Sequence, residues 1–264
     1  MPDPVRLTPE LRERVWGRLR LAPWFADPAR PIGEAWYLAD RDLPILVKLI
    51  FTSERLSVQV HPEDGEDGPR GKTEMWHILD AEPGATIALG FREPVTRDRL
   101  WEATRTGEVE QLLNWVPVKA GETYFTPAHT VHAIGAGIVL AEIQQNSDVT
   151  YRLWDYGRPR EIHVDKAVPL SDLGVHPGAV VPRPIAEGRE ELVRSRHFVT
   201  ELVRMAPGQV LTPEHHECQL WICIEGAGVV GGKPCRAGEV WWLPAPAEVR
   251  AESTARFLRT WYPG

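Results

Sequence analysis

The sequence is poor in sulfur-containing residues, with three cysteines and three methionines among 264 residues. Cys218, Cys223 and Cys235 form an odd set without a Cys-x-x-Cys pair, which argues against a disulfide framework and a thiolate zinc site. No apolar run approaches the length of a membrane span, and the first residues lack the basic-then-apolar pattern of a secretory signal. We therefore expect a cytoplasmic protein with no membrane partner.

The chain also lacks an excess of positive charge, since its formal net charge is -7. An acidic balance argues against a general nucleic-acid-binding protein. It leaves room for a small anionic ligand, because such a ligand needs only a local cluster of lysine and arginine. The composition, 43% hydrophobic and 25% charged, is that of a soluble globular protein.

Proline and glycine are abundant, with 24 and 22 residues spread along the whole chain. This spread favours many short strands joined by turns over long helices. Strand candidates are rich in β-branched and aromatic residues and are bounded by glycine or proline. They are ILVKLIF, LSVQVH, EMWHIL, TIALGF, ETYFTP, IVLAEIQ, HFVTELVRM, LWICIEG, EVWWLP and RFLRTWY. The sequence predicts a mostly β fold.

An internal repeat indicates two β units. AGETYFTPA at Ala120–Ala128 and AGEVWWLPA at Ala237–Ala245 keep Gly, Glu, Pro and the aromatic pairs in register. Between the two copies, a proline-rich stretch with little periodicity fits a linker. We expect a first domain at 1–166, a linker at 167–189 and a second domain at 190–264. Paired jelly-roll β-barrels are the preferred architecture, and a single large sandwich is the alternative.

Helical signals are confined to the first half. Thr8 before Pro9 is typical of an N-cap with proline at the first helical position, leading into LRERVWGRL. Thr96 is a second N-cap candidate, for a helix that runs to Arg105 and pauses at Gly107. It resumes as VEQLLNW, with apolar residues at helical spacing up to Val116. These segments predict a few peripheral helices packed on a β core.

Four side chains form a candidate metal site. Gln59 and His61 lie two apart in LSVQVH, so on a strand both project from one face. Glu74 enters the next strand candidate, and His132 follows PAHTV, so strands lying side by side would bring all four together. This set of nitrogen and oxygen donors suits zinc and would also accept manganese, iron or cobalt. The alternative is that each histidine is an ordinary hydrogen-bonded core residue.

Three charged residues accompany this set. Lys72 lies two residues before Glu74 and is either a functional cation, a partner of Glu74, or a solvated loop lysine. Glu142 lies on the polar face of GIVLAEIQQ, where it is a general-base candidate if that face lines a cavity, or a solvent-facing residue if not. Arg152 could clamp an oxyanion or a phosphate, or pair with Asp155.

In these segments the chain resembles the type I mannose-6-phosphate isomerases of the cupin superfamily, in their shorter bacterial branch. The resemblance covers most of the chain, and its motifs occur in the family's order. They are RVWG, GEAW (Gly33–Trp36), LPILVKLI, LSVQVHPED, GKTEMW, LLNWVPVKAGETYFTPAHTVHAI and EIQQNSDVTYRLWDYGR. The resemblance implies two cupin-like barrels, of which the first is catalytic.

The resemblance also implies roles for individual residues. It matches Gln59, His61, Glu74 and His132 to the ligands of one Zn²⁺ per chain, and Arg152 to the active-site arginine. It places Lys72 and Glu142 in proton transfer, and Ser57 beside the substrate phosphate together with Lys72 and Arg152.

The implied reaction interconverts mannose 6-phosphate and fructose 6-phosphate through an enediol, in a chain that is a monomer or a homodimer. The alternatives are a non-catalytic sugar-phosphate-binding regulator, an isomerase for a related sugar phosphate, and another metal cupin such as an oxygenase.

The second unit resembles a degenerate cupin. It keeps His215 and His216, but Val249 stands at the position that corresponds to His132. This unit is therefore expected to be a structural partner without a complete metal site. Three departures from the family pattern lie in the first unit. The stretch before LPILVKLI is short, the acidic loop that joins His61 to Glu74 is also shortened, and His129 replaces a glycine, which matters if that position needs a positive φ.

Overall fold

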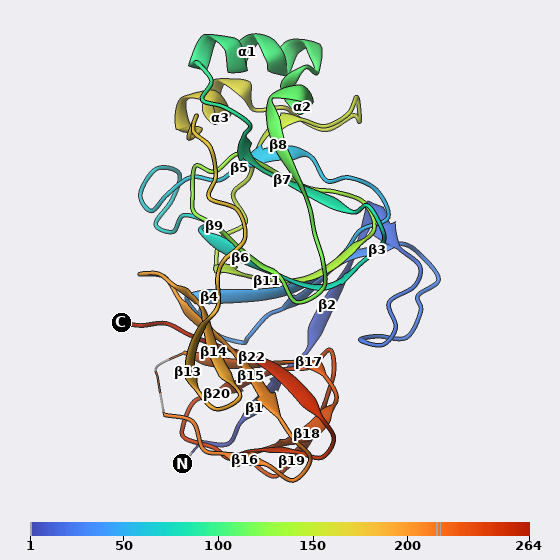
Figure 1. The fold of residues 1–264 in the computed structure, drawn as a ribbon, viewed down its shortest axis with the longest axis vertical. Helices are drawn as coiled ribbons and strands as arrows, with labels where there is room; N and C mark the ends of the chain where they lie inside the picture. Colours follow the sequence, from blue (N-terminus) through green and yellow to red (C-terminus); the bar gives the residue numbers. More distant parts are fainter. Residues whose placement is uncertain (1, 215, 217) are drawn as a thin grey trace.

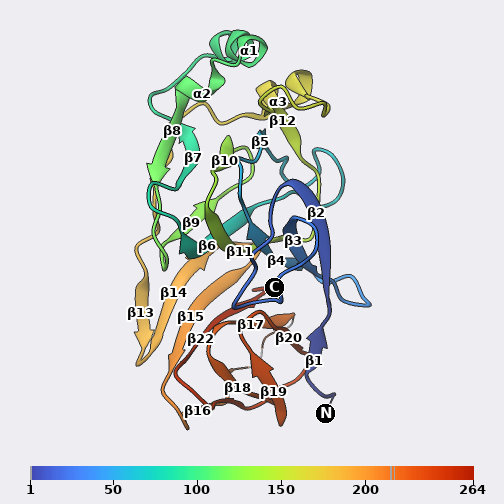
Figure 2. The same cartoon turned by 90° about the vertical axis from the view of Figure 1, so that its right-hand side faces the viewer.

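The computed structural model describes residues 2–214, 216 and 218–264, which fold into five stacked layers (Figure 1). A cap of short helices covers a five-stranded sheet, followed by six-, seven- and four-stranded sheets (Figures 1 and 2). The strands within each sheet pair antiparallel. We call the helices with the five- and six-stranded sheets the N-terminal unit, and the seven- and four-stranded sheets the C-terminal unit.

The N-terminal unit is built from three helices and eleven strands of the described chain. The helices are α1 (Arg97–Thr106), α2 (Val109–Leu112) and α3 (Val164–Leu170). The five-stranded sheet has the order β12 (Tyr151–Trp154), β5 (Val58–Val60), β10 (His132–Ile134), β7 (Thr86–Phe91), β8 (Leu113–Pro117). The six-stranded sheet has the order β2 (Pro9–Arg18), β3 (Ile32–Tyr37), β4 (Ile45–Phe51), β11 (Ile138–Gln145), β6 (Glu74–Ala81), β9 (Thr123–Thr126).

The C-terminal unit also takes in the first strand of the chain. Its seven-stranded sheet has the order β1 (Val5–Leu7), β20 (Val240–Leu243), β17 (Gln219–Glu225), β22 (Ala255–Trp261), β15 (Val199–Met205), β14 (Arg189–Arg194), β13 (Arg183–Ala186). Its four-stranded sheet has the order β16 (Val210–Leu211), β21 (Val249–Ala251), β18 (Ala227–Val230), β19 (Lys233–Arg236).

Apolar residues fill each gap between the layers, and β4 shows how the sequence achieves this. All seven residues of ILVKLIF are buried, because the six-stranded sheet is covered on both faces. Side chains alternate between the faces of a strand. Val47, Leu49 and Phe51 therefore join the core shared with the seven-stranded sheet, whereas Ile50 joins the core shared with the five-stranded sheet. Lys48 lies on the same face as Ile50, inside the N-terminal unit.

The predicted mostly β fold with two jelly-roll units is confirmed. Each unit consists of two facing antiparallel sheets that do not close into a continuous barrel, and the single large sandwich is not found. The repeated segments occupy equivalent places. Gly121, with φ of 91°, precedes β9, and Gly238, with φ of 89°, precedes β20. Both strands are four residues long, as a shared turn and strand unit requires.

The predicted helices are partly wrong. Thr96 does cap α1, since its side chain accepts a hydrogen bond from the backbone N of Arg99, and Gly107 ends the helix with φ of 83°. Residues 9–18, however, form strand β2, whose pairing with β3 overrides the local capping signal. The later helix stops after α2, and β8 follows as an edge strand beside β7. Among the described residues, no helix is long and apolar enough to cross a bilayer.

Replacing Thr96 with alanine is expected to lower the free energy of unfolding by about 1 kcal/mol, because the backbone N–H of Arg99 loses its capping acceptor. Urea denaturation of the variant and the wild type would measure the difference. Thr96→Ser keeps a hydroxyl at the cap and should stay close to the wild type. Equal losses in the two variants would contradict the capping role.

Candidate active site

Two rows of polar side chains face each other inside the N-terminal unit. On the five-stranded sheet, Arg152, Gln59 and His132 lie opposite one another on β12, β5 and β10. On the six-stranded sheet, a second row crosses β4, β11 and β6 through Lys48, Glu142 and Trp76. The rings of Trp76 and His132 meet edge to face, with centroids 5.3 Å apart, so the two rows are in contact across the gap between the sheets.

His61, Glu74 and His132 form a buried group that can hold a metal ion, with one ligand atom from each all within 4.8 Å of one another. The Nε2 atoms of His61 and His132 lie 3.6 and 3.4 Å from the two carboxylate oxygens of Glu74. His61 directly follows β5, Glu74 begins β6, and His132 begins β10. Strands from both sheets therefore bring the three residues to one point.

The hydrogen bonds around this group fit a metal site. The Nδ1 atoms of His61 and His132 lie 2.9 and 2.8 Å from the backbone oxygens of Val149 and Thr130. Because a carbonyl can only accept, each Nδ1 carries the proton and each Nε2 keeps its lone pair on the side of Glu74. Glu74 Oε1 is buried and accepts no hydrogen bond. A buried carboxylate oxygen without a partner is costly, and a bound cation would satisfy it.

Burial and the charge of Lys72 lower the pKa of both histidines. The pKa of His132 falls to about 3, and that of His61 falls well below its usual value. Both imidazoles are therefore neutral at physiological pH, which is the form that ligates a metal.

Gln59 lies at the edge of this group. Its amide nitrogen is 3.2 Å from His132 Nε2, and its Oε1 accepts a hydrogen bond of 3.2 Å from Ser57 Oγ. Rotation of the amide by 180° would turn Oε1 toward His132 and keep a hydrogen bond to the hydroxyl of Ser57, which both donates and accepts. Gln59 is thus placed to add an oxygen to the three donors.

Lys72 is not a solvated loop lysine. It is buried, and its Nζ lies 2.8 Å from Glu74 Oε2 and 2.9 Å from His61 Nε2. Burial opposes its charge, but Glu74 and Glu142 outweigh that effect and raise the pKa of Lys72. The cationic Lys72 side chain therefore lies in direct contact with two of the candidate metal ligands, Glu74 and His61.

Glu142 faces the interior and not the solvent. Its carboxylate accepts hydrogen bonds from Lys48 Nζ at 2.9 Å and from Trp76 Nε1 at 3.1 Å. Burial would raise the pKa of Glu142, but Lys48 and Lys72 outweigh it and hold the pKa well below its usual value. Glu74 has the opposite shift, because burial and Glu142 raise its pKa above the usual range despite Lys72. The two carboxyl groups thus differ in their affinity for a proton.

Lys48 is a site residue that the sequence analysis missed. It is buried, its Nζ contacts Glu142 and Gln144 at 2.9 and 2.5 Å, and it lies 4.1 Å from the centroid of the Trp36 ring. A lysine in the middle of the apolar strand ILVKLIF is the signal that could have found it, since a buried charge needs a partner.

A cavity of about 210 Å³ adjoins the metal-binding group. Gln59 and Lys72 form part of its wall and connect it to the three ligands. Its other charged or hydroxyl-bearing lining residues are Arg14, Glu34, Lys48, Ser57, Glu142, Asp148, Thr150, Arg152 and Arg160. The structure thus brings every predicted site residue either into the metal-binding group or onto the wall of one cavity.

Arg152 does not pair with Asp155, which was one interpretation of the sequence. Asp155 instead holds Arg158 at 3.3 Å and Arg160 at 2.5 Å. Arg152 Nε is buried without a hydrogen-bond partner, and the side chain lines the cavity. Arg152 is therefore available to an anion in the cavity.

His129 occupies a left-handed backbone conformation with φ of 71°. Its backbone N donates to His61 O at 2.9 Å, and its own O accepts from Asp172 N at 2.8 Å. These bonds hold the loop before His132 against the backbone of His61. The Nε2 of His129 also contacts Glu66 at 2.7 Å. A histidine is thus accommodated at the position where the resemblance led us to expect glycine.

The C-terminal unit has no equivalent metal-binding group within the described part of the chain. Val249 begins β21 and is buried in the apolar core, at the place that His132 takes at the start of β10. The ring of His216 stacks on Trp261, with centroids 4.6 Å apart. His215 lies outside the described residues.

Comparison with known proteins gives a consistent picture. No protein-family model matches the chain. The Bacillus subtilis protein named "Probable mannose-6-phosphate isomerase GmuF" is 30% identical over 313 aligned positions, covering 98% of this chain and 99% of that protein. Mannose-6-phosphate isomerase ManA of the same organism is 34% identical over 65% of this chain and 69% of its own length.

Solved structures agree in fold. The crystal structure of the mannose 6-phosphate isomerase from Bacillus subtilis superimposes with a TM-score of 0.88 at 26% identity, covering 98% of this chain and 99% of that one. A mutant phosphomannose isomerase from Salmonella typhimurium gives a TM-score of 0.79 at 17% identity, which supports the fold alone. With a curated relative at 30% identity aligned over nearly the whole of both sequences, the chain belongs to the mannose-6-phosphate isomerase family.

Proposed function

We propose that this enzyme interconverts mannose 6-phosphate and fructose 6-phosphate with one bound Zn²⁺. The observation that carries the proposal is the joining of a buried two-histidine, one-carboxylate group to a cavity lined by Arg152, Lys72 and Glu142. The family membership supports the same reaction.

His61, Glu74 and His132 would hold the metal, with Gln59 as a fourth donor. Two imidazole nitrogens with two oxygens are a donor set that suits zinc. When bound, the metal would polarise and orient the sugar oxygens beside the reacting carbons. The unpartnered Glu74 Oε1 and the two fixed Nδ1–H groups support this assignment.

The charges around the cavity suit a sugar phosphate. The buried Lys48 and Lys72 balance Glu74 and Glu142, so a divalent cation and Arg152 would leave the site positive. A phosphate dianion is attracted by such a field. Arg152 would clamp a substrate oxygen, and the hydroxyl of Ser57, also on the cavity wall, would donate to the phosphate.

Glu142 is our candidate for the group that carries the proton between C2 and C1. Lys48 keeps it ionised at neutral pH, so it is free to accept the proton from the aldose and return it to the neighbouring carbon of the enediol. Lys72 would give a proton to O1 as the enediol forms and take one back from the O2 hydroxyl as the ketone forms, while Arg152 would donate hydrogen bonds to the oxygens on which negative charge develops. Each cycle returns all three groups to their starting charge.

We further propose that residues 1–166 form the catalytic domain, 167–189 the linker, and 190–264 a structural partner. The ends of the linker belong to the two units, since α3 runs to Leu170 and β13 (Arg183–Ala186) pairs with β14. The predicted site residues all come from the first range. The partner covers the outer face of the six-stranded sheet, where Leu202, Leu220 and Leu258 meet the side chains of β4. Strand β1 pairs with β20, so the first residues fasten the two units together.

A coupled assay that detects fructose 6-phosphate tests the function. With mannose 6-phosphate and added zinc we expect turnover, and chelation of the metal should reduce it to background. Binding of mannose 6-phosphate without turnover under any divalent metal would support a sugar-phosphate-binding regulator instead. Faster turnover of a different sugar phosphate would transfer the assignment to that substrate.

A further inference from the structure

The segment from Pro62 to Thr73 connects two metal-binding residues, His61 and Glu74, and also carries Lys72. It contains no helix or strand, so its position depends on individual contacts. Its two ends are joined, because Lys72 N donates to Pro62 O at 3.0 Å. What holds this loop therefore also holds Lys72 and Glu74 in place.

Asp64 closes the loop from within. Its Oδ1 accepts hydrogen bonds from Gly71 N at 2.8 Å and from the side-chain nitrogen of Gln145 at 2.7 Å. The two arms of the loop touch at Gly71, where an added Cβ would lie 2.5 Å from the backbone carbon of Glu63. Asp64 thus fixes the close approach that brings the chain back toward the metal-binding group.

Gln145, which is bonded to Asp64, also holds the backbone of Thr73, the residue between Lys72 and Glu74. Its side-chain oxygen accepts from Thr73 N at 2.9 Å, and its own backbone N donates to Thr73 O at 3.0 Å. Gln145 is buried at the end of β11, next to Gln144, which lies opposite Glu74. The rigid sheet and the loop are therefore joined through one amide side chain.

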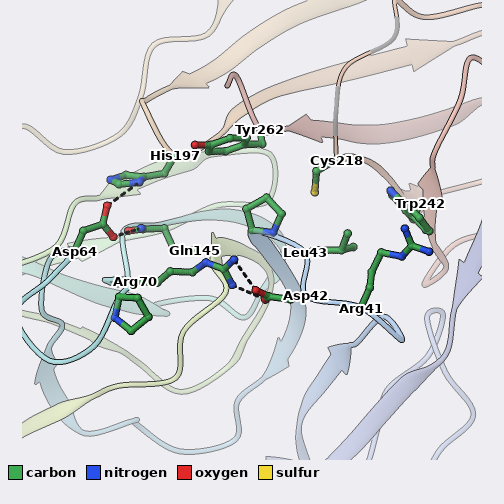
Figure 3. Close-up of a pocket in the computed structure, with 12 residues that line it drawn as sticks. Arg41, Asp42, Leu43, Asp64, Arg70, Gln145, His197, Cys218, Trp242 and Tyr262 are labelled. Atoms are coloured by element: carbon green, nitrogen blue, oxygen red, sulfur yellow. Dashed lines mark hydrogen bonds and ion pairs between the residues drawn. The ribbon is translucent and has the colours of Figure 1, made fainter.

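Figure 3 shows Asp64 and Gln145 in the wall of a second cavity, of about 540 Å³, between the two units. Asp64 points toward His197, whose Nδ1 lies 3.8 Å from Asp64 Oδ2, and Gln145 lies next to Asp64, bonded to its other carboxylate oxygen (Figure 3). His197 belongs to the turn between β14 and β15 of the C-terminal unit. The Asp64–Gln145 pair thus lies between this cavity and the loop that carries Lys72.

We infer that Asp64 and Gln145 are positioning residues that set the geometry of Lys72 and Glu74, and through them the affinity of the metal-binding group. Neither side chain is one of the metal-binding residues, and neither lines the catalytic cavity. Their hydrogen bonds fix the backbone on either side of Lys72 and immediately before Glu74. A ligand group that is not held in place binds its metal more weakly, as loss of supporting contacts around metal ligands does in general.

The test is the zinc affinity of metal-free protein, measured by competition with a chelator, so that it does not depend on turnover. Asp64→Ala and Gln145→Leu are expected to weaken zinc binding about tenfold to hundredfold and to lower kcat more than they raise KM. Asp64→Asn keeps an acceptor for Gly71 N and for Gln145, and should stay within about threefold of the wild type by the same reasoning. Tyr262→Phe, in the wall of the same cavity, should leave both quantities unchanged.

The inference rests on the proposed function, but the two fail differently. Wild-type protein that binds zinc and does not isomerise mannose 6-phosphate overturns the proposed function, while the affinities of the variants still test the positioning role. Unchanged zinc affinity in Asp64→Ala and Gln145→Leu overturns the positioning role. So does an Asp64→Asn variant as weak as Asp64→Ala, because the charge and not the hydrogen-bond acceptor would then matter. Thermal denaturation of each variant shows whether a loss comes from unfolding.

Discussion

Replacing His132 with alanine is expected to reduce bound zinc to background and to abolish isomerisation. The variant removes one of the two imidazoles of the proposed metal site, in which Glu74 Oε1 accepts no hydrogen bond. Metal content after dialysis and turnover of mannose 6-phosphate measure the two effects. An active, metal-free His132→Ala protein would show that the reaction does not need the metal, and would contradict the proposed mechanism.

His132→Phe separates ligation from packing. Phenylalanine can keep an aromatic contact with Trp76, which meets the His132 ring edge to face, but it offers no ligand atom. We expect it to lose zinc and turnover as fully as the alanine variant, with less loss of stability. If it retained activity, the ring of His132 and not its nitrogen would be the functional feature.

Replacing Lys48 with methionine is expected to destabilise the protein by about 3–5 kcal/mol, because it leaves the buried carboxylate of Glu142 without its partner. The pKa of Glu142 should also rise, since Lys48 is the first of the cations that hold it down. Urea denaturation at neutral pH measures the loss of stability. Turnover should fall as well, because a smaller fraction of Glu142 would be ionised at neutral pH and able to accept the proton.

The double variant Lys48→Met with Glu142→Gln provides the control. It replaces both charges, so it should recover a large part of the stability lost in Lys48→Met while remaining inactive. If the stability loss of the double variant equalled the sum of the losses of Lys48→Met and Glu142→Gln, the two charges would not interact. Recovery of stability without recovery of activity would separate the structural role of this ion pair from its catalytic role.

How much of the site the sequence predicted depends on how far apart along the chain the interacting residues lie. Gln59 and His61 are two residues apart on a strand, so the period of the β backbone alone puts them on one face. The meeting of His132 with Gln59 depends on the pairing of β10 with β5, across 73 positions of chain. The residues alone offered that meeting as one alternative, and the family motifs favoured it, because no local pattern encodes it.

The errors have a similar cause. The Thr8–Pro9 signal is a valid helix start, and it fails because residues 9–13 and 18 pair with β3 instead. The helix capped by Thr96 succeeds because no strand competes for its residues. Lys48 was overlooked for a related reason: its partner Glu142 is 94 residues away, on a strand that only the sheet order brings beside β4.

The sequence by itself determined the mostly β class, the repeated glycine-to-proline strand and the residue types of the metal-binding group, because these follow from backbone period, turn chemistry and ligand chemistry. The tertiary structure alone decided that Arg152 faces a cavity while Arg158 and Arg160 hold Asp155. It also decided that Lys48 neutralises Glu142 and that Asp64 and Gln145 support the loop of Lys72. Burial and charge pairing depend on which strands lie side by side, and that order is fixed only when the sheets pack.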